Sequence, residues 1–209
     1  MKSKAEQLTI SAPNFKTAEF KIVGVAPYVQ NKFSAKARAK MHDSQSAGHA
    51  GKKGKAKEAK DFEAAYREAM HTSSEGWVGI PAPAFRNAMI SACRIIGFKM
   101  THAKLGVFIE ADGIDADDGT PLVRITKGKP EYTELAVRNE TGVCDLRPRP
   151  MWREWEATVR IRFDADMFTL PDLANLLMRA GQQVGVGEGR PDSRKSCGLG
   201  WGLFALKDK

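Results

Sequence analysis

The 209-residue chain carries 33 lysines and arginines against 25 aspartates and glutamates, which gives a formal net charge of +8. Hydrophobic residues make up 42% of the chain, enough for one large core, but no apolar run approaches the length of a membrane span. The composition therefore argues against a membrane-spanning protein and favours an anionic partner, with nucleic acid ahead of a membrane surface.

The three cysteines, Cys93, Cys144 and Cys197, lack the spacing of a metal site, so we expect free thiols in a reducing compartment. The opening residues MKSKAEQLTI lack the apolar stretch of a secretion signal. We expect a location in the cytoplasm of a bacterial host cell, with no membrane partner, no bound metal and no cofactor.

The first predicted element is a strand over residues 19–25, in which Phe20 and Ile22 share one face. A basic insertion over residues 32–60 follows it, with only Asp43 and Glu58 as acids. We expect a mobile loop that orders against phosphates, or else a solvated loop without a partner. Its candidate nucleic-acid contacts are Lys32, Lys36, Arg38, Lys40, Lys52, Lys53, Lys55 and Lys57.

A short helix is predicted to resume at Asp61, and a second helix to begin near Pro83 and stop at Gly97. On the second helix Arg86 and Arg94 share roughly one side, either as phosphate contacts or as ordinary surface residues.

Strands are predicted at 105–110 and 121–125, separated by an acidic turn that we interpret as solvated. The stretch 126–150 reads as irregular. Within it Arg147 and Arg149 alternate with prolines, which suits either a charged edge contact or a solvent-facing linker.

The clearest strand covers 154–163, with apolar and polar side chains on alternate faces, as expected for a sheet covered on one side. Thr169 is predicted to cap a helix that ends at Gly181, and a closing strand covers 203–206.

Seven glycines and a cationic cluster mark the glycine-rich segment, residues 181–202. The segment is either a tight hairpin or a wall whose backbone amides and cations meet phosphate. Trp201 is either a core residue or a stacking platform for a base. The residues that we expect on nucleic acid here are Gly187, Gly189, Arg190, Arg194, Lys195 and Trp201.

Together the elements predict an α+β fold with a ferredoxin-like βαββαβ core, interrupted by the basic insertion and by a second insertion at 112–150 before the third strand. In such a plan both helices cover one face of the sheet, and the free face commonly receives single-stranded nucleic acid.

Two segments also resemble a known family. The segment Ile80–Arg94 (IPAPAFRNAMISACR) resembles the opening of the first helix in the RAMP superfamily, and GVGEGR (185–190) with GLGWGLF (198–204) resembles its glycine-rich loop and following strand. The resemblance implies a single RAMP-like domain over 1–209, similar to the backbone subunits of Class 1 CRISPR effector complexes. Those subunits polymerise along guide RNA and wrap it with insertions. The chain is also similar to stand-alone proteins of tailed phages, through APYVQNKFSAKA and DLRPRP.

These observations favour a non-catalytic protein that binds single-stranded nucleic acid, with RNA ahead of DNA, and that assembles side by side as a homo-oligomer or filament. Three alternatives stay open: a phage protein that binds or anneals single-stranded DNA in recombination, a metal-dependent ribonuclease that uses Asp43, and a structural phage protein. The resemblance makes Asp43 the sole catalytic candidate, because RNA-cleaving members of the superfamily place an aspartate in the loop after the first strand, and Asp43 lies in that loop within MHDSQ.

Overall fold

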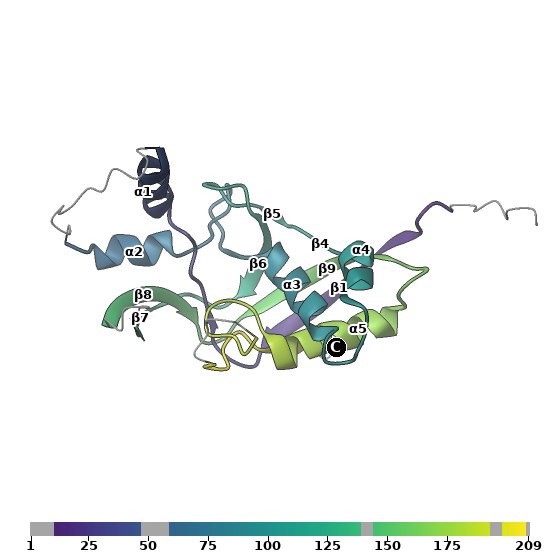
Figure 1. Ribbon diagram of the computed structural model, residues 1–209. Coiled ribbons are helices and arrows are strands. Elements are labelled where there is room, and N and C mark those ends of the chain that lie inside the picture. The colour runs from purple at the N-terminus through teal and green to yellow at the C-terminus, as the bar shows by residue number, and fades with distance from the viewer. Residues whose placement is uncertain (1–10, 47–58, 139–143, 193–197, 208–209) are drawn as a thin grey trace, which may run out of the picture.

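The computed structural model describes residues 11–46, 59–138, 144–192 and 198–207. Over these residues the protein has a mixed α+β architecture in which two antiparallel sheets lie side by side (Figure 1). The larger sheet carries two packed helices, and the smaller one joins two strands from the second insertion to a short strand that precedes the basic insertion. No helix among the described residues is long and apolar enough to cross a membrane.

The centre of the larger sheet is β9 (Glu156–Asp164), which pairs antiparallel with β1 (Phe15–Gly24) on one side. On its other side β9 pairs with β4 (Val107–Glu110) and, further along, with β6 (Pro121–Lys127). The remaining strands at the edges are β10 (Phe204–Leu206) on β1, and β3 (Gly79–Pro81) and β5 (Gly113–Ile114) on β6. The strand predicted at 154–163 is confirmed because its alternate apolar residues are buried.

Helices α3 (Ala82–Ala92) and α5 (Leu170–Arg179) cover one face of this sheet (Figure 1). The side chain of Thr169 accepts a hydrogen bond from the amide of Asp172 in a capping box, which confirms the predicted start of α5. The prediction that this helix ends at Gly181 was wrong, because a π-helical turn, η1 (Ala180–Val184), continues the helix beyond that residue. A short helix that the sequence did not predict, α4 (Met100–Gly106), precedes β4.

The smaller sheet has the order β2 (Tyr28–Val29), β8 (Cys144–Trp152), β7 (Glu131–Arg138), with α2 (Phe62–Glu68) packed against β8. The expectation that 126–150 is irregular was therefore wrong. Pro148 and Pro150 lack a backbone N–H, but β2 pairs only with the last two residues of β8, so the prolines lie where no ladder hydrogen bond is required.

Aromatic side chains join the two sheets. The ring of Tyr28 lies 5.5 Å from the rings of both Trp152 and Trp155, and all three side chains are buried. The indole N–H of Trp155 donates to the carbonyl of Ala26 at 2.9 Å. This junction joins the smaller sheet to the core of the larger one.

The basic insertion contains α1 (Ala35–Ser46), where the sequence predicted a loop. Its helix has no buried residue, which is why hydrophobic periodicity gave no signal for it. In Figure 1 α1 stands away from the larger sheet, above α2.

Candidate nucleic-acid interface

A groove of about 750 Å³ runs between α3, the glycine-rich segment and the β2–β8 side of the smaller sheet. We call it the α3 groove. It joins the two segments that carry the family resemblance with the second insertion. Its lining includes Gln30, Asn31, His71, Asn87, Ser91, Arg147, Arg190, Asp192 and the backbone from Val184 to Gly189.

The glycine-rich segment forms one wall of the α3 groove through very close backbone packing. At Gly202, with φ +70°, a Cβ would lie 1.7 Å from the carbonyl oxygen of Val186, and at Gly187 it would lie 2.5 Å from that of Val29. Only glycine fits such positions. The amide of Gly202 donates to Pro27 at 2.7 Å, and the amide of Glu188 donates to Val29 at 2.9 Å. The segment is thus a braced wall in which the amides of Glu188 and Gly202 are hydrogen-bonded within the protein.

Trp201 belongs to the same wall and is half-buried. Its amide donates to the carbonyl of Gly189 at 3.2 Å, and a Cβ on Gly189 would lie 2.6 Å from the indole ring. Trp201 therefore packs on the wall over Gly189, whose lack of a side chain makes room for the indole.

Two arginines line the α3 groove from opposite elements. Arg190 donates through Nη1 to the carbonyl of Gly187 at 2.8 Å, and Arg147 pairs through Nε with Asp145 at 3.1 Å. Both side chains are only partly buried, so their cationic groups border the groove. The α3 groove thus brings together four of the predicted residues, namely these two arginines with Gly187 and Gly189 of the glycine-rich segment.

The other predicted arginines make structural contacts in this conformation. Arg149 is buried and donates to Glu188 at 2.5 Å. Arg94 pairs with Asp192 at 2.6 Å, which ties the glycine-rich segment to α3. Arg86 donates to the carbonyl of Val107 at 3.0 Å, so its guanidinium holds the start of β4.

A buried ionic cluster lies beside the α3 groove, which one of its members, His71, lines. Lys32 donates to Asp115 at 2.7 Å and to Asp117 at 2.6 Å, and the Nδ1 of His71 lies 2.8 Å from Asp115. Asp115 has no exposed side-chain surface, so the interpretation of this acidic turn as solvated was wrong for Asp115. The turn is organised around a buried lysine that comes from the other insertion, which the local sequence does not reveal.

Electrostatics explain why this cluster is charged although it is buried. Burial alone would raise the pKa of Asp115, but hydrogen bonds from Lys32, the amide of Asp117 and His71 lower the pKa below its ordinary value. Burial alone would lower the pKa of Lys32, but the two carboxylates raise it.

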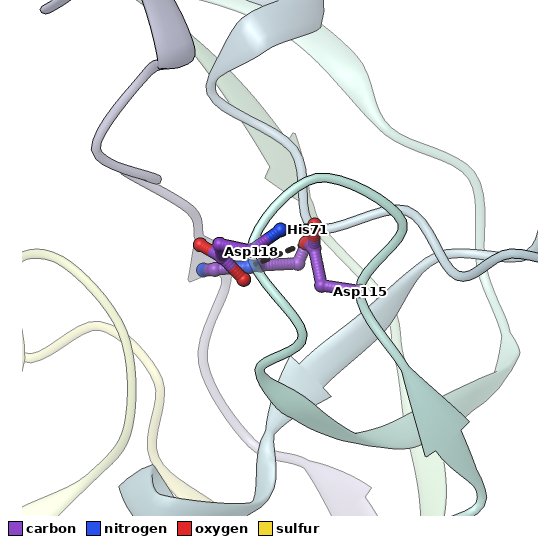
Figure 2. Close-up of side chains that lie close together, drawn as sticks. All are labelled: His71, Asp115 and Asp118. Atoms are coloured by element: carbon purple, nitrogen blue, oxygen red, sulfur yellow. Dashed lines mark hydrogen bonds and ion pairs between the residues drawn. The ribbon is translucent and has the colours of Figure 1, made fainter. Parts of the chain in front are cut away.

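His71, Asp115 and Asp118 are close enough together to suggest a metal site (Figure 2). The ammonium of Lys32 lies 2.7 Å from Asp115. It supplies the positive charge that a cation would otherwise bring, and the same carboxylate also accepts from His71. The donor set therefore fits a lysine-centred ionic cluster and does not fit a metal ion.

The remaining predicted contacts fall on α1 or outside the described residues. Lys36 and Lys40 are exposed on α1, and Arg38 lies 3.6 Å from Asp118. Asp43 is also exposed on α1, 3.9 Å from His42, with no buried partner that would make it a general base. Lys52, Lys53, Lys55, Lys57, Arg194 and Lys195 lie outside the described residues.

The open face of the larger sheet is rich in carboxylates. In the strand register Arg160 lies between Glu19 and Glu110, and its Nη2 bonds Asp112 at 2.6 Å. Glu156, on the same strand, pairs with Lys207 at 2.6 Å. The cations Arg160 and Lys207 at this face are therefore already paired with carboxylates.

Sequence reasoning missed three groove residues, Asn31, His71 and Asn87. A signal for Asn87 existed, since Ala84, Asn87, Ala88 and Ser91 follow helical spacing and share one face of α3. For His71 there was none, because its partner Asp115 is distant in the sequence. No protein-family model matches the chain, and no curated protein matches it.

Proposed function

We propose that the protein binds single-stranded nucleic acid, RNA in preference to DNA, in the α3 groove. The observation that carries the proposal is the groove itself. It lies where α3 meets the glycine-rich segment, the two segments that resemble the RAMP superfamily, and it is bordered by Arg147 and Arg190. Such cations release counterions from a strand when they contact its phosphates.

We also propose that the core is ferredoxin-like and of the RAMP type. The strand order β10-β1-β9-β4, with α3 between β1 and β4 and α5 between β9 and β10, supports this assignment. Numbered along a βαββαβ chain, that order is fourth, first, third, second. All these pairings are antiparallel, as the plan requires.

Helix α1 supports the same function. A helix of this length is marginal in water by itself, and α1 has no buried residue to stabilise it. It exposes the cationic side chain of Lys40, so a polyanion is a partner that would stabilise it. In this proposal α1 closes over a strand that lies in the α3 groove, and neighbouring subunits follow side by side along the strand.

Fluorescence anisotropy with labelled single-stranded RNA, single-stranded DNA and duplex tests the proposal between about 50 and 200 mM salt. We expect RNA to bind most tightly, with affinity that falls as salt rises. The double variant Arg147→Ala/Arg190→Ala should lower the slope of log affinity against log salt by about 1.4, because each phosphate contact on a single strand contributes about 0.7. Arg179→Ala, an exposed arginine on α5, is the matched control and should leave the slope unchanged.

The result that would overturn the proposal is an absence of salt-dependent binding to any single strand. A double variant that binds like the wild type would remove the α3 groove as the site. Assembly is tested separately by mass photometry on short and long strands. We expect the number of bound subunits to grow with strand length.

A further inference from the structure

The interior of the α3 groove presents hydrogen-bonding groups that the fold itself does not use. Asn87 lies on the exposed face of α3, and Asn31 follows β2 on the other side of the groove. Within the part of the chain that the structure describes, neither side-chain amide has a hydrogen-bond partner. An amide of this kind offers a donor and an acceptor next to each other.

His71 adds a third group, and the protein fixes its orientation. Its backbone amide donates to Gln30 at 3.0 Å, and its Nδ1 lies 2.8 Å from the buried carboxylate of Asp115. Because Asp115 has a lowered pKa and is ionised, it accepts a hydrogen bond, so Nδ1 carries the proton. With the proton on Nδ1, the Nε2 atom is a hydrogen-bond acceptor whenever it carries no second proton. No described residue bonds to Nε2, and the ring lines the groove.

The charges around the α3 groove show which part of a strand fits there. Two carboxylates, Glu188 and Asp192, line the same groove as Arg147 and Arg190, and they are paired with Arg149 and Arg94. A phosphate backbone suits the arginines but gains little from an interior with two carboxylates, two amides and an imidazole. The edge of a nucleobase suits those amides and that imidazole, since its amino, ring-nitrogen and carbonyl groups pair with such side chains.

We propose that the α3 groove takes one base of the bound strand and selects an amino base, adenine or cytosine. The exocyclic amine donates to Nε2 of His71 and to an amide oxygen of Asn87 or Asn31, while the adjacent ring nitrogen accepts from an amide N–H. Uracil and hypoxanthine carry a carbonyl oxygen in place of that amine, and this oxygen would face the acceptor Nε2. The inference rests on the proposed function and adds to it that the affinity for a strand depends on the base in the α3 groove.

The test compares strands of adenosine, cytidine, uridine and inosine at about pH 8, where free histidine is neutral. Adenosine and inosine have bases of nearly equal size, so their affinity ratio isolates the amino group. We expect adenosine to bind on the order of tenfold more tightly than inosine, and cytidine similarly more tightly than uridine. Asn87→Ala and Asn31→Ala should each reduce these ratios while salt-dependent binding to uridine strands persists. Asn175→Ala, on the exposed face of α5, is the control and should change neither.

Each outcome decides the inference. Equal affinity for all four strands with intact salt dependence overturns base selection but leaves strand binding standing, as does a preference for uridine or inosine. Ratios that survive in both asparagine variants remove the assigned residues and so overturn the inference. No binding to any strand overturns the proposed function and base selection together.

Discussion

Replacing Lys32 with methionine is the sharpest test of how the two insertions are held together. The Lys32 side chain has 3% of its surface exposed and the Asp115 side chain has none. Lys32→Met keeps most of the apolar stem but leaves the buried carboxylate without its ammonium partner. Removing one partner of a buried ion pair costs about 3–5 kcal/mol. That is a large share of the total stability of an ordinary domain, about 5–15 kcal/mol.

Urea unfolding followed by tryptophan fluorescence measures this loss as a fall in the midpoint at an unchanged slope. The control is Lys207→Met, which breaks a pair with Glu156 in which 46% of the lysine side chain is exposed. We expect the control to cost less than about 1 kcal/mol. A similarly small cost for Lys32→Met would refute the reasoning, because the cluster would then behave like a surface ion pair.

The same cluster predicts a pH dependence whose sign is fixed by the pKa of Asp115. Since folding lowers this pKa, the carboxylate stabilises the native state above its unfolded value, about 3.9, and the stability is lost as pH falls through the folded value. Lys32→Met should therefore show a shallower loss of stability below about pH 4 than the wild type. A steeper acid transition in the variant would contradict this assignment.

Three further outcomes follow from packing and exposure. Gly202→Ala should lower stability by more than about 2 kcal/mol, because the new Cβ meets the carbonyl of Val186 at a positive φ; a thermal melt equal to the wild type would exclude that contact. Thr169→Ala should cost about 1 kcal/mol by removing the cap of α5, and a Thr169→Ser variant should recover most of it, as urea midpoints would show. Cys144 is exposed and should react quickly with a thiol reagent. Cys93, whose thiol pKa is raised by burial, should react only on unfolding, and equal rates would contradict its burial.

The central strands and both covering helices were predictable from the sequence because each one buries a single face. In β9 the alternation of apolar and polar residues matches the alternation of buried and more exposed side chains. In α5 the predicted cap and apolar stripe match the observed capping box and buried leucines. The β7–β8 hairpin was not predictable, because its prolines argue against a strand unless the edge on which they lie is known to be unpaired. Helix α1 was not predictable either, because none of its residues is buried and its sequence therefore has no hydrophobic periodicity.

The candidate site divides in the same way. The sequence singled out the glycine-rich segment and the helix that became α3 through their family resemblance. In the structure they form two walls of one groove. The third wall depends on two long-range pairings, of β2 with β8 and of Lys32 with Asp115. Those contacts join residues far apart in the chain, so no spacing rule connects them. That is why His71 had no recognisable role until its buried partner was placed.

The glycines also take a different role from the one that their number suggested. Gly187 and Gly202 allow backbone segments to approach closely, and the amides of Glu188 and Gly202 are used to brace the wall. Affinity for a strand must then come mainly from the side chains that border the α3 groove. Substitution of Gly187 should therefore reduce stability and binding together. Substitution of Arg190, whose only described hydrogen bond is to the carbonyl of Gly187, should reduce binding with little loss of stability. A Gly187→Ala variant that folds normally yet fails to bind would instead assign the ligand contact to the glycine backbone.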